Sequence, residues 1–412
     1  MIAAPGAKAG LQPAFAFIFV VVLLDVIAIG VIIPVLPRLL EGFTGSMARA
    51  SEINGIFTAS WALMQLLFSP VLGALSDRFG RRPVILLSCL GLAIDFFLVA
   101  LAPSLAWLFV ARLIGGITMA NMSTASAYIA DVTPVEQRAA RFGMLGAAWG
   151  LGFVLGPLLG GWLGASDVRL PFWVAGGIGL ANALYGFFVL PESLPPEQRS
   201  PFRLKAAHPI GALKLLGRTP LLQRLSVING LYLFAHQVFP TVFVLHAAYR
   251  FQWGPEQVGI TLAIVGIAGT VVQAALVGRI VARIGERSAM LAGLGCGVIA
   301  LSFYGLAPTG EWFWVGIVFG AFMGLYGPAS QTLMTAQIPP DEQGQLQGAN
   351  ASIMGLTGLL APLVFAFAFS WAIGSGKDWG VPGTPYLLAA ALLAVAALLA
   401  WSVRAVRTST AV

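Results

Sequence analysis

Long apolar runs recur along the whole chain and constrain its fold more than any other feature. About 20 consecutive apolar residues in a helix cross the hydrocarbon core of a bilayer, and twelve runs between charged or Pro/Gly-rich breaks reach that length. Only 9% of the residues are charged, against about 25% in a typical soluble domain. The sequence therefore predicts an all-α, polytopic membrane protein. The expected spans cover residues 14–36, 53–74, 83–102, 105–130, 141–164, 170–190, 221–247, 256–279, 288–307, 311–335, 345–373 and 383–403.

The longest polar stretch, residues 191–220, divides these spans into two sets of six. We expect an N-terminal six-helix bundle over residues 1–190, a cytoplasmic linker over 191–220, and a C-terminal bundle over 221–412. The two halves repeat at an offset of about 205 residues: the loop Gly73–Gly80 matches Gly278–Gly285, and Pro157 matches Pro362. A duplicated, pseudo-symmetric six-helix unit is typical of secondary transporters.

The lysines and arginines indicate the orientation of the chain, because cytoplasmic loops carry an excess of them. Of the 23 such residues, seventeen lie on the side of the two termini and the linker, and five lie on the opposite side. We therefore expect a multi-pass protein of the bacterial inner membrane with both termini in the cytoplasm.

Several classes of function are excluded by composition. The net charge of +7 is split among short loops, so it forms no basic face for nucleic acid. Cys89 and Cys296 each lie in an apolar run and are too few for a disulfide framework or a zinc site. No nucleophile–base pair, metal cluster or phosphate-binding loop is recognisable, so we do not expect an enzyme.

The loop after the second span carries a dense motif. It reads Gly73-Ala-Leu-Ser-Asp77-Arg78-Phe-Gly80-Arg81-Arg82-Pro83. Gly80 permits the backbone conformation of a tight turn, and Asp77 can pair with a nearby arginine or approach a helix N-terminus. A plain anchor of positive charge is the alternative, but it explains neither Asp77 nor the glycine spacing.

The fifth span combines small residues with a proline. Its glycines at four-residue spacing share one helical face and let a neighbouring helix approach closely. Pro157 is expected to kink the helix, although generic packing of small residues is the alternative. The motif comprises Gly152, Gly156, Pro157, Gly160 and Gly161, and Gly164 extends it.

Asp25, Asp95 and Arg112 are ionisable residues within the first six spans. A charge in the bilayer interior is costly and marks a functional site by default. Either carboxylate is therefore a candidate proton carrier. The alternative is a structural pair in which one of them neutralises Arg112.

The second half offers neutral polar and aromatic groups instead. An apolar wall with a few hydrogen-bonding groups suits a bulky amphipathic ligand, whereas ordinary packing between helices is the alternative for each residue. The candidates for this substrate cavity are Tyr232, His236 and Gln237 in the seventh span and Met323, Tyr326 and Gln331 in the tenth.

These motifs resemble the major facilitator superfamily, and within it the tetracycline/proton antiporters. The resemblance covers nearly the whole chain and implies two bundles of six helices, a cytoplasmic latch at the Asp77 loop, and antiport through the glycine–proline helix. It also implies roles in coupling or substrate binding for Asp25, Gln65, Asp95 and Arg112. The further matching segments are Leu24–Pro37, Ala62–Gln65, Gly115–Thr118, Tyr128–Asp131, Phe142–Gly143, Gln237–Pro240 and Gln345–Gly348.

Two departures from that family bear on the substrate. The family has an acidic residue in the ninth span where this chain has Gly297, and its run of small residues in the fourth span is replaced here around Asn121 and Met122, which join the cavity candidates. A tetracycline that travels with a divalent cation would thus meet only neutral groups in the second half.

The expected function is proton-coupled export of an amphipathic, drug-like compound by alternating access, with a tetracycline as the leading candidate. We expect a monomer with no bound cofactor, driven by the proton gradient, whose partners are its substrate, protons and the bilayer. Whether a divalent cation is carried with the substrate is a question that the sequence leaves open. The alternatives are a proton-coupled uptake symporter for a small metabolite, or a non-transporting membrane sensor that kept the fold.

Overall fold

The computed structural model describes residues 11–119, 122–199, 213–339 and 342–403. Over these ranges the chain is helical and has no strand, and twelve helical segments are long and apolar enough to cross a membrane. The predicted all-α architecture with twelve spans is therefore confirmed. Asn121, one of the residues predicted to line the substrate cavity, lies outside the described residues.

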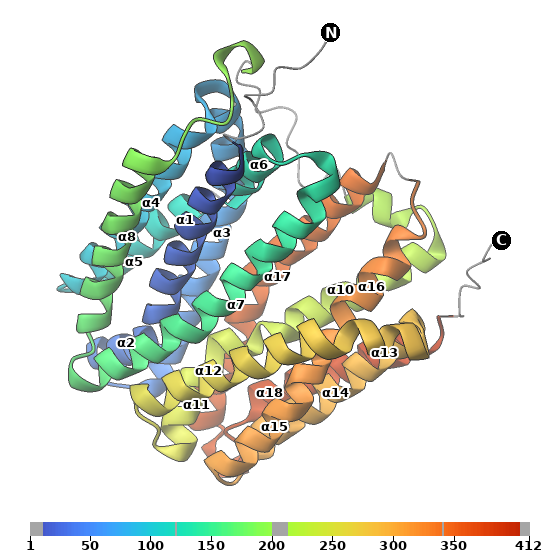
Figure 1. Ribbon diagram of the computed structural model, residues 1–412. Helices are drawn as coiled ribbons and strands as arrows, with labels where there is room; N and C mark the ends of the chain where they lie inside the picture. Colours follow the sequence, from blue (N-terminus) through green and yellow to red (C-terminus); the bar gives the residue numbers. More distant parts are fainter. Residues whose placement is uncertain (1–10, 120–121, 200–212, 340–341, 404–412) are drawn as a thin grey trace. The chain divides into compact units, whose positions relative to one another are not determined.

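The chain forms two compact units, of which unit 1 comprises Met1–Ala207 and Trp253–Gly266. It contains the first part of α12 (Pro255–Val271) in addition to the first eight helices (Figure 1). These are α1 (Leu11–Ile32), α2 (Leu36–Thr44), α3 (Met47–Phe79), α4 (Arg81–Ala100), α5 (Leu105–Met119), α6 (Met122–Val132), α7 (Val135–Ser166) and α8 (Leu170–Val189), followed by the short turn η1 (Pro196–Gln198).

Unit 2 comprises His208–Gln252 and Ile267–Val412. The expected division of the chain at residues 190 and 220 stays a prediction, because residues 200–212 of the linker are not described. The elements of this unit are η3 (Leu213–Gly217), α10 (Pro220–His236), α11 (Val238–Phe251), the end of α12, η4 (Val272–Leu276), α13 (Val277–Ile284), α14 (Glu286–Leu306), α15 (Gly310–Phe322), η5 (Met323–Leu325), α16 (Tyr326–Thr335), α17 (Gln343–Ile373), η7 (Lys377–Trp379) and α18 (Thr384–Trp401).

A seam between α1 and α7 forms the closest helix pair of unit 1, and the two helices run side by side in Figure 1. The glycines of α7 face α1 at four-residue spacing. A Cβ on Gly156 would lie 2.6 Å from Gly30 Cα, and a Cβ on Gly160 would lie 1.9 Å from the carbonyl oxygen of Val31. Only glycine permits backbones to approach this closely, so the stripe read from the sequence is the contact surface of this pair.

Both copies of the repeated loop turn through a glycine with positive φ. Gly80 separates α3 from α4 with φ of 104°, and Gly285 separates α13 from α14 with φ of 78°. L-residues with a side chain avoid this region. The repeat seen in the sequence thus corresponds to the same sharp turn in each unit.

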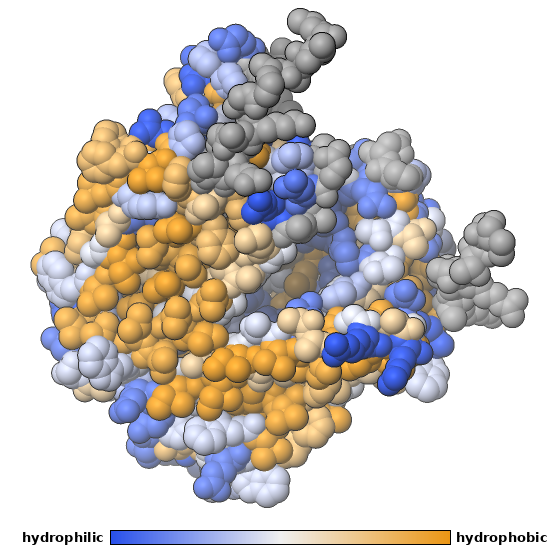
Figure 2. All heavy atoms as spheres, viewed as in Figure 1, coloured by the Kyte–Doolittle hydropathy of each residue, from blue (hydrophilic) through white to orange (hydrophobic). Residues whose placement is uncertain are grey.

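Apolar side chains cover the outward faces of the helices. Figure 2 shows them over α7, α8 and α12, with hydrophilic residues gathered near helix ends. Large side chains such as Trp162, Phe188 and Leu398 are more than two-thirds exposed. A soluble protein rarely exposes so much contiguous apolar surface, whereas lipid acyl chains would cover it.

We predict that Gly160→Ala destabilises the protein by about 1–3 kcal/mol, because the added methyl group must push α7 away from α1. Thermal unfolding of the purified protein in detergent should show a lower midpoint. Gly146→Ala is the matched control on the same helix, since a Cβ there meets nothing within 4 Å. An equal midpoint for the two variants would contradict the seam.

Candidate functional site

Asp25 lies in the middle of α1, with 2% of its surface exposed. Two neutral side chains contact its carboxylate. The Asn182 amide of α8 donates to Oδ1 at 2.9 Å and to the Val21 carbonyl oxygen at 2.8 Å, and the Cys89 thiol of α4 donates to Oδ2 at 3.8 Å. Hydrogen bonds from two other helices therefore hold this buried carboxylate in place.

Asp95 and Arg112 form a second buried centre in unit 1. Arg112 Nη2 donates to Asp95 Oδ2 at 2.6 Å, and Gly115 makes room for this pair, because a Cβ there would lie 2.5 Å from the same oxygen. Asp95 Oδ1 and Arg112 Nε have no hydrogen-bond partner among the described residues. The pair thus keeps one acceptor and one donor without a partner among the described residues. Of the two acids considered as partners of Arg112, Asp95 is the one that pairs with it.

These two centres are separate along α4. Cys89, which contacts Asp25, and Asp95 are six residues apart, or about 9 Å along the helix axis. Sequence reasoning groups Asp25, Asp95 and Arg112 only by their residue type. The structure divides them into a carboxylate that accepts from Asn182 and Cys89 and a carboxylate bound to an arginine.

Arg81 is the centre of an ion-pair cluster at the loop between α3 and α4. Its guanidinium pairs with Asp77, pairs with Asp131 of α6 at 3.2 Å, and donates to Ser76 Oγ at 2.8 Å. Asp131 also accepts a hydrogen bond from Ser193 Oγ at 3.0 Å. The motif loop is therefore tied to α6 and to the segment that follows α8.

The other motif residues have different partners. Arg82 Nη2 donates to the carbonyl oxygen of Phe187 on α8 at 2.5 Å, and its guanidinium lies 5.6 Å from the centre of that ring. Arg78 is exposed, and Gly73 is half-buried near the end of α3. Of the three arginines in the motif, Arg81 is therefore the one that pairs with Asp77.

Glu192 caps the first turn of α4 from a distant part of the chain. Its carboxylate accepts hydrogen bonds from the backbone N–H of Arg81 at 2.8 Å and of Arg82 at 3.3 Å, and also from the N–H groups of Ser193 and Leu194. A carboxylate at a helix N-terminus satisfies free N–H groups and complements the helix dipole. The absence of a side chain on Gly80 makes this approach possible, because a Cβ there would lie 2.2 Å from Glu192 Oε2.

Unit 2 brings together an aromatic and amide cluster. The rings of Tyr232 and Tyr326 stack with centroids 3.8 Å apart, and Tyr232 also lies 6.0 Å from His236. Tyr326 donates to Asn229 Oδ1 at 3.3 Å, and the amide of Asn229 donates to Asn350 Oδ1 at 3.3 Å. This chain of hydrogen bonds joins α10, α16 and α17.

Two of the three spans that carry this cluster are interrupted beside it. Gln237 separates α10 from α11, and the turn η5 (Met323–Leu325) separates α15 from α16. Interrupted helices are common at the substrate sites of transporters, since they offer backbone groups and adaptable geometry there. Pro240, Gly324 and Pro328 lie within a turn of these breaks and account for them.

The remaining cavity candidates are dispersed. Gln65, Gln237 and Gln331 are half-buried, and the side chain of Met122 at the start of α6 is outside the described residues. Met323 packs inside unit 2, because a Cβ on Gly297 would meet its Sδ at 3.2 Å and Leu393 Cδ1 at 2.6 Å. The position where the resembled family has an acid is therefore filled by apolar side chains.

Comparison with known proteins decides the family. The Major Facilitator Superfamily model matches residues 18–362 and, a second time, residues 225–411. The class C tetracycline resistance protein from Escherichia coli is 37% identical to the chain, over 89% of this chain and 93% of the relative. The class E protein from the same organism is also 37% identical, over 87% of this chain and 90% of the relative. The chain belongs to the major facilitator superfamily. The crystal structure of the human organic anion transporter MFSD10 (TETRAN) is similar, with 25% identity, a TM-score of 0.70, and coverage of 97% of this chain and all of that one.

Membership of the major facilitator superfamily makes the protein a transporter and not an enzyme. Its twelve spans and its bacterial relatives make it a multi-pass protein of the inner membrane. The predicted family and fold class are therefore confirmed.

Sequence reasoning missed several residues that hold this transporter's charged and polar groups in place. Asn182 stands in an apolar span with no motif around it, Glu192 lies in the segment assigned to the linker, and Asn350 follows a polar run. The one signal for Asn182 was a polar side chain within an apolar run, which calls for a partner because an unpaired amide in hydrocarbon is costly.

Proposed function

We propose that the transporter exports an amphipathic, drug-like compound in exchange for protons by alternating access, with a tetracycline as the leading candidate. The observation that carries this proposal is the buried carboxylate of Asp25 within a membrane span, where Asn182 and Cys89 donate to it. The names of the relatives, which are tetracycline resistance proteins, support the choice of substrate. They also favour export over the alternatives of metabolite uptake and of a non-transporting sensor.

In this proposal Asp25 carries or gates the proton. Asn182 holds the carboxylate against α8 by donating two hydrogen bonds, one to Asp25 and one to the backbone of α1. Protonation of Asp25 weakens the hold of Asn182, because a neutral acid attracts an amide donor less than a carboxylate does. The contact between α1 and α8 thus becomes sensitive to the proton.

The Asp95–Arg112 pair is proposed as a second coupling element. The pair joins α4 to α5 through a charge-assisted hydrogen bond, which protonation of Asp95 or a competing anion would break. The free acceptor of Asp95 and the free donor of Arg112 are available to a water chain or to a polar group of the substrate.

The cluster around Tyr232 is proposed as the wall that contacts the substrate. Stacked phenol rings offer a flat apolar surface, and Asn229 adds hydrogen-bonding groups beside them. Such a surface suits a fused-ring compound with polar edges. The roles of His236, Gln65, Gln237, Gln331, Asn121, Met122 and Met323 stay predictions.

The Arg81 cluster is proposed as the cytoplasmic latch, with both termini on the same side of the membrane and the protein working as a monomer. Its contacts link α3, α4, α6 and the segment after α8. Ion pairs near the protein surface are individually weak, so this partly buried cluster can break and reform during a transport cycle.

The function is tested by efflux from cells and by uptake into inverted membrane vesicles energised with a proton gradient. We expect transport of a tetracycline and also of metal-free lipophilic drugs, with weak dependence on magnesium, because Leu393 and Met323 fill the position at Gly297 and offer no carboxylate to a metal complex. Strict dependence on magnesium with tetracyclines as the only substrates would contradict the broad range. Vesicles that move none of these compounds would refute the function.

Asp25→Asn should abolish accumulation against a gradient while leaving exchange of substrate down its gradient measurable, because the substitution keeps the shape but removes the titrating group. Both rates are measured in the same proteoliposomes. Asp378→Asn, which changes an exposed carboxylate outside the predicted spans, is the control and should behave as wild type. Proton-driven accumulation by Asp25→Asn at the wild-type rate would show that the proton is carried elsewhere.

Asp77→Asn should lower the maximal transport rate roughly tenfold or more, a rise of about 1.4 kcal/mol in the barrier, with little change in apparent affinity. The physical reason is that Asp77 pairs with Arg81 in the loop and does not lie among the cavity candidates. Glu197→Gln changes an exposed carboxylate after the cluster and serves as the control. A large loss of affinity at an unchanged rate would point to a binding role and not a latch.

A further inference from the structure

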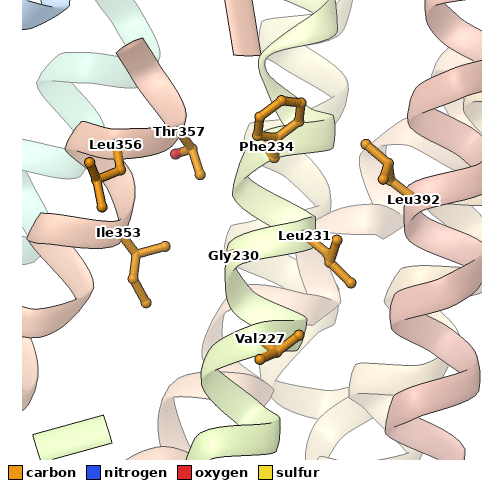
Figure 3. Close-up of a pocket in the computed structure, with 8 residues that line it drawn as sticks. All are labelled: Val227, Gly230, Leu231, Phe234, Ile353, Leu356, Thr357 and Leu392. Atoms are coloured by element: carbon orange, nitrogen blue, oxygen red, sulfur yellow. The ribbon is translucent and has the colours of Figure 1, made fainter. Parts of the chain in front are cut away.

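Three helices of unit 2, α10, α17 and α18, leave a cavity of about 440 Å³ between them (Figure 3). Val227, Leu231 and Phe234 point into it from α10, and Leu392 faces them from α18. The complete lining is Val227, Gly230, Leu231, Phe234, Ile353, Leu356, Thr357 and Leu392.

The lining offers nothing for water to bind. Its only side-chain polar atom is the hydroxyl of Thr357, which donates to the carbonyl oxygen of Met354 at 3.0 Å. Cavities lined by apolar side chains stay dry and accept apolar ligands. The lining of this cavity therefore suits a hydrocarbon group.

The cavity lies on the side of α10 away from the proposed substrate wall. With 3.6 residues per turn, Val227, Leu231 and Phe234 follow one stripe of α10, and Asn229, Tyr232 and His236 follow the opposite stripe. Val227 and Leu356 at the rim are 49% and 43% exposed. The opening is thus apolar and faces away from the polar stripe of α10, which is the character of a helix surface that acyl chains can cover.

Gly230 keeps the cavity open. A glycine within a helix costs about 1 kcal/mol relative to alanine, and in the α1–α7 seam close packing explains such residues. No close contact explains Gly230, because a Cβ there would meet only Ile353 Cγ2, at 3.7 Å. The repeat offset of about 205 residues places Gly230 where the first half has Asp25.

Positive charge gathers at one end of this apolar stripe. Arg224 lies one turn before Val227 on the same stripe, and its Nη1 donates to the carbonyl and hydroxyl oxygens of Ser402 just after α18. Arg287 donates to the carbonyl oxygen of Trp401 at 2.6 Å. Trp401 itself is 73% exposed, and exposed tryptophan with arginine is typical of the level of lipid headgroups.

The distances along the helix match one leaflet. Arg224 and Phe234 are ten residues apart, or about 15 Å along α10, which is half of the hydrocarbon thickness of about 30 Å. A lipid with its phosphate at Arg224 would therefore reach the end of the cavity with its acyl chain. A guanidinium has five N–H donors, and Arg224 uses a single nitrogen for Ser402.

We propose that this cavity binds one acyl chain of an anionic phospholipid whose phosphate is bound by Arg224. The lipid wedges between α10 and the pair α17 and α18, on the reverse side of the helix that carries Tyr232 and Asn229. Its occupancy fixes the position of α10.

The test uses the delipidated full-length protein in detergent and native mass spectrometry. Phosphatidylglycerol and phosphatidylcholine with identical acyl chains are titrated in parallel. We expect wild type to retain phosphatidylglycerol about fivefold more tightly, the effect of about one arginine at the headgroup level. Arg224→Gln should abolish this preference, whereas Arg283→Gln, which removes an exposed cation on α13, should leave it unchanged.

Gly230→Leu fills the cavity and should weaken retention of both lipids, and Leu231→Trp fills it from the neighbouring position should the first variant not fold. Gly177→Leu is the control, since a Cβ on that exposed residue of α8 meets nothing within 4 Å. Equal retention by all variants would overturn the proposal. Displacement of the lipid by tetracycline would identify a substrate site instead, and equally tight binding of glycerol phosphate would show a phosphate site without an acyl chain.

Discussion

A backbone N–H or C=O group within hydrocarbon has no water to bond to, and the rest of the structure depends on this constraint. It makes every span a helix, and it confines helix breaks to places where other groups surround the backbone. The breaks at Gln237 and at Met323–Leu325 lie beside the Tyr232–Tyr326 stack and its amides. Irregular backbone and polar side chains therefore occur together in unit 2, because both need hydrogen-bonding partners within the protein.

The same constraint determines which side chains surround a buried acid. Asp25 is held by donors that carry no charge, whereas Asp95 is held by a guanidinium. One unit thus contains two buried carboxylates with different hydrogen-bond partners.

The number of spans, the repeat and the glycine stripe could be predicted from the sequence, because each depends on spacing along one helix or on local composition. The partners of Asp25 could not be predicted in this way. Asn182 is 157 residues away from it, and no local pattern distinguishes it from other polar residues in the spans. The same holds for Glu192, whose role follows from the turn at Gly80 bringing the start of α4 to the end of α8. Contacts between distant segments depend on how helices pack, and single spans do not record that.

The cap at Glu192 also has a mechanical consequence. The segment after α8 is fastened to the first turn of α4 through Glu192, and to α6 through Ser193 and Asp131. A movement of the chain beyond Leu194 would therefore act on the hydrogen bonds between Glu192 and the first turn of α4 before it acted on the last turn of α8. A displacement of this segment would thus reach the loop that carries Asp77 through hydrogen bonds, without passing through the rest of α8.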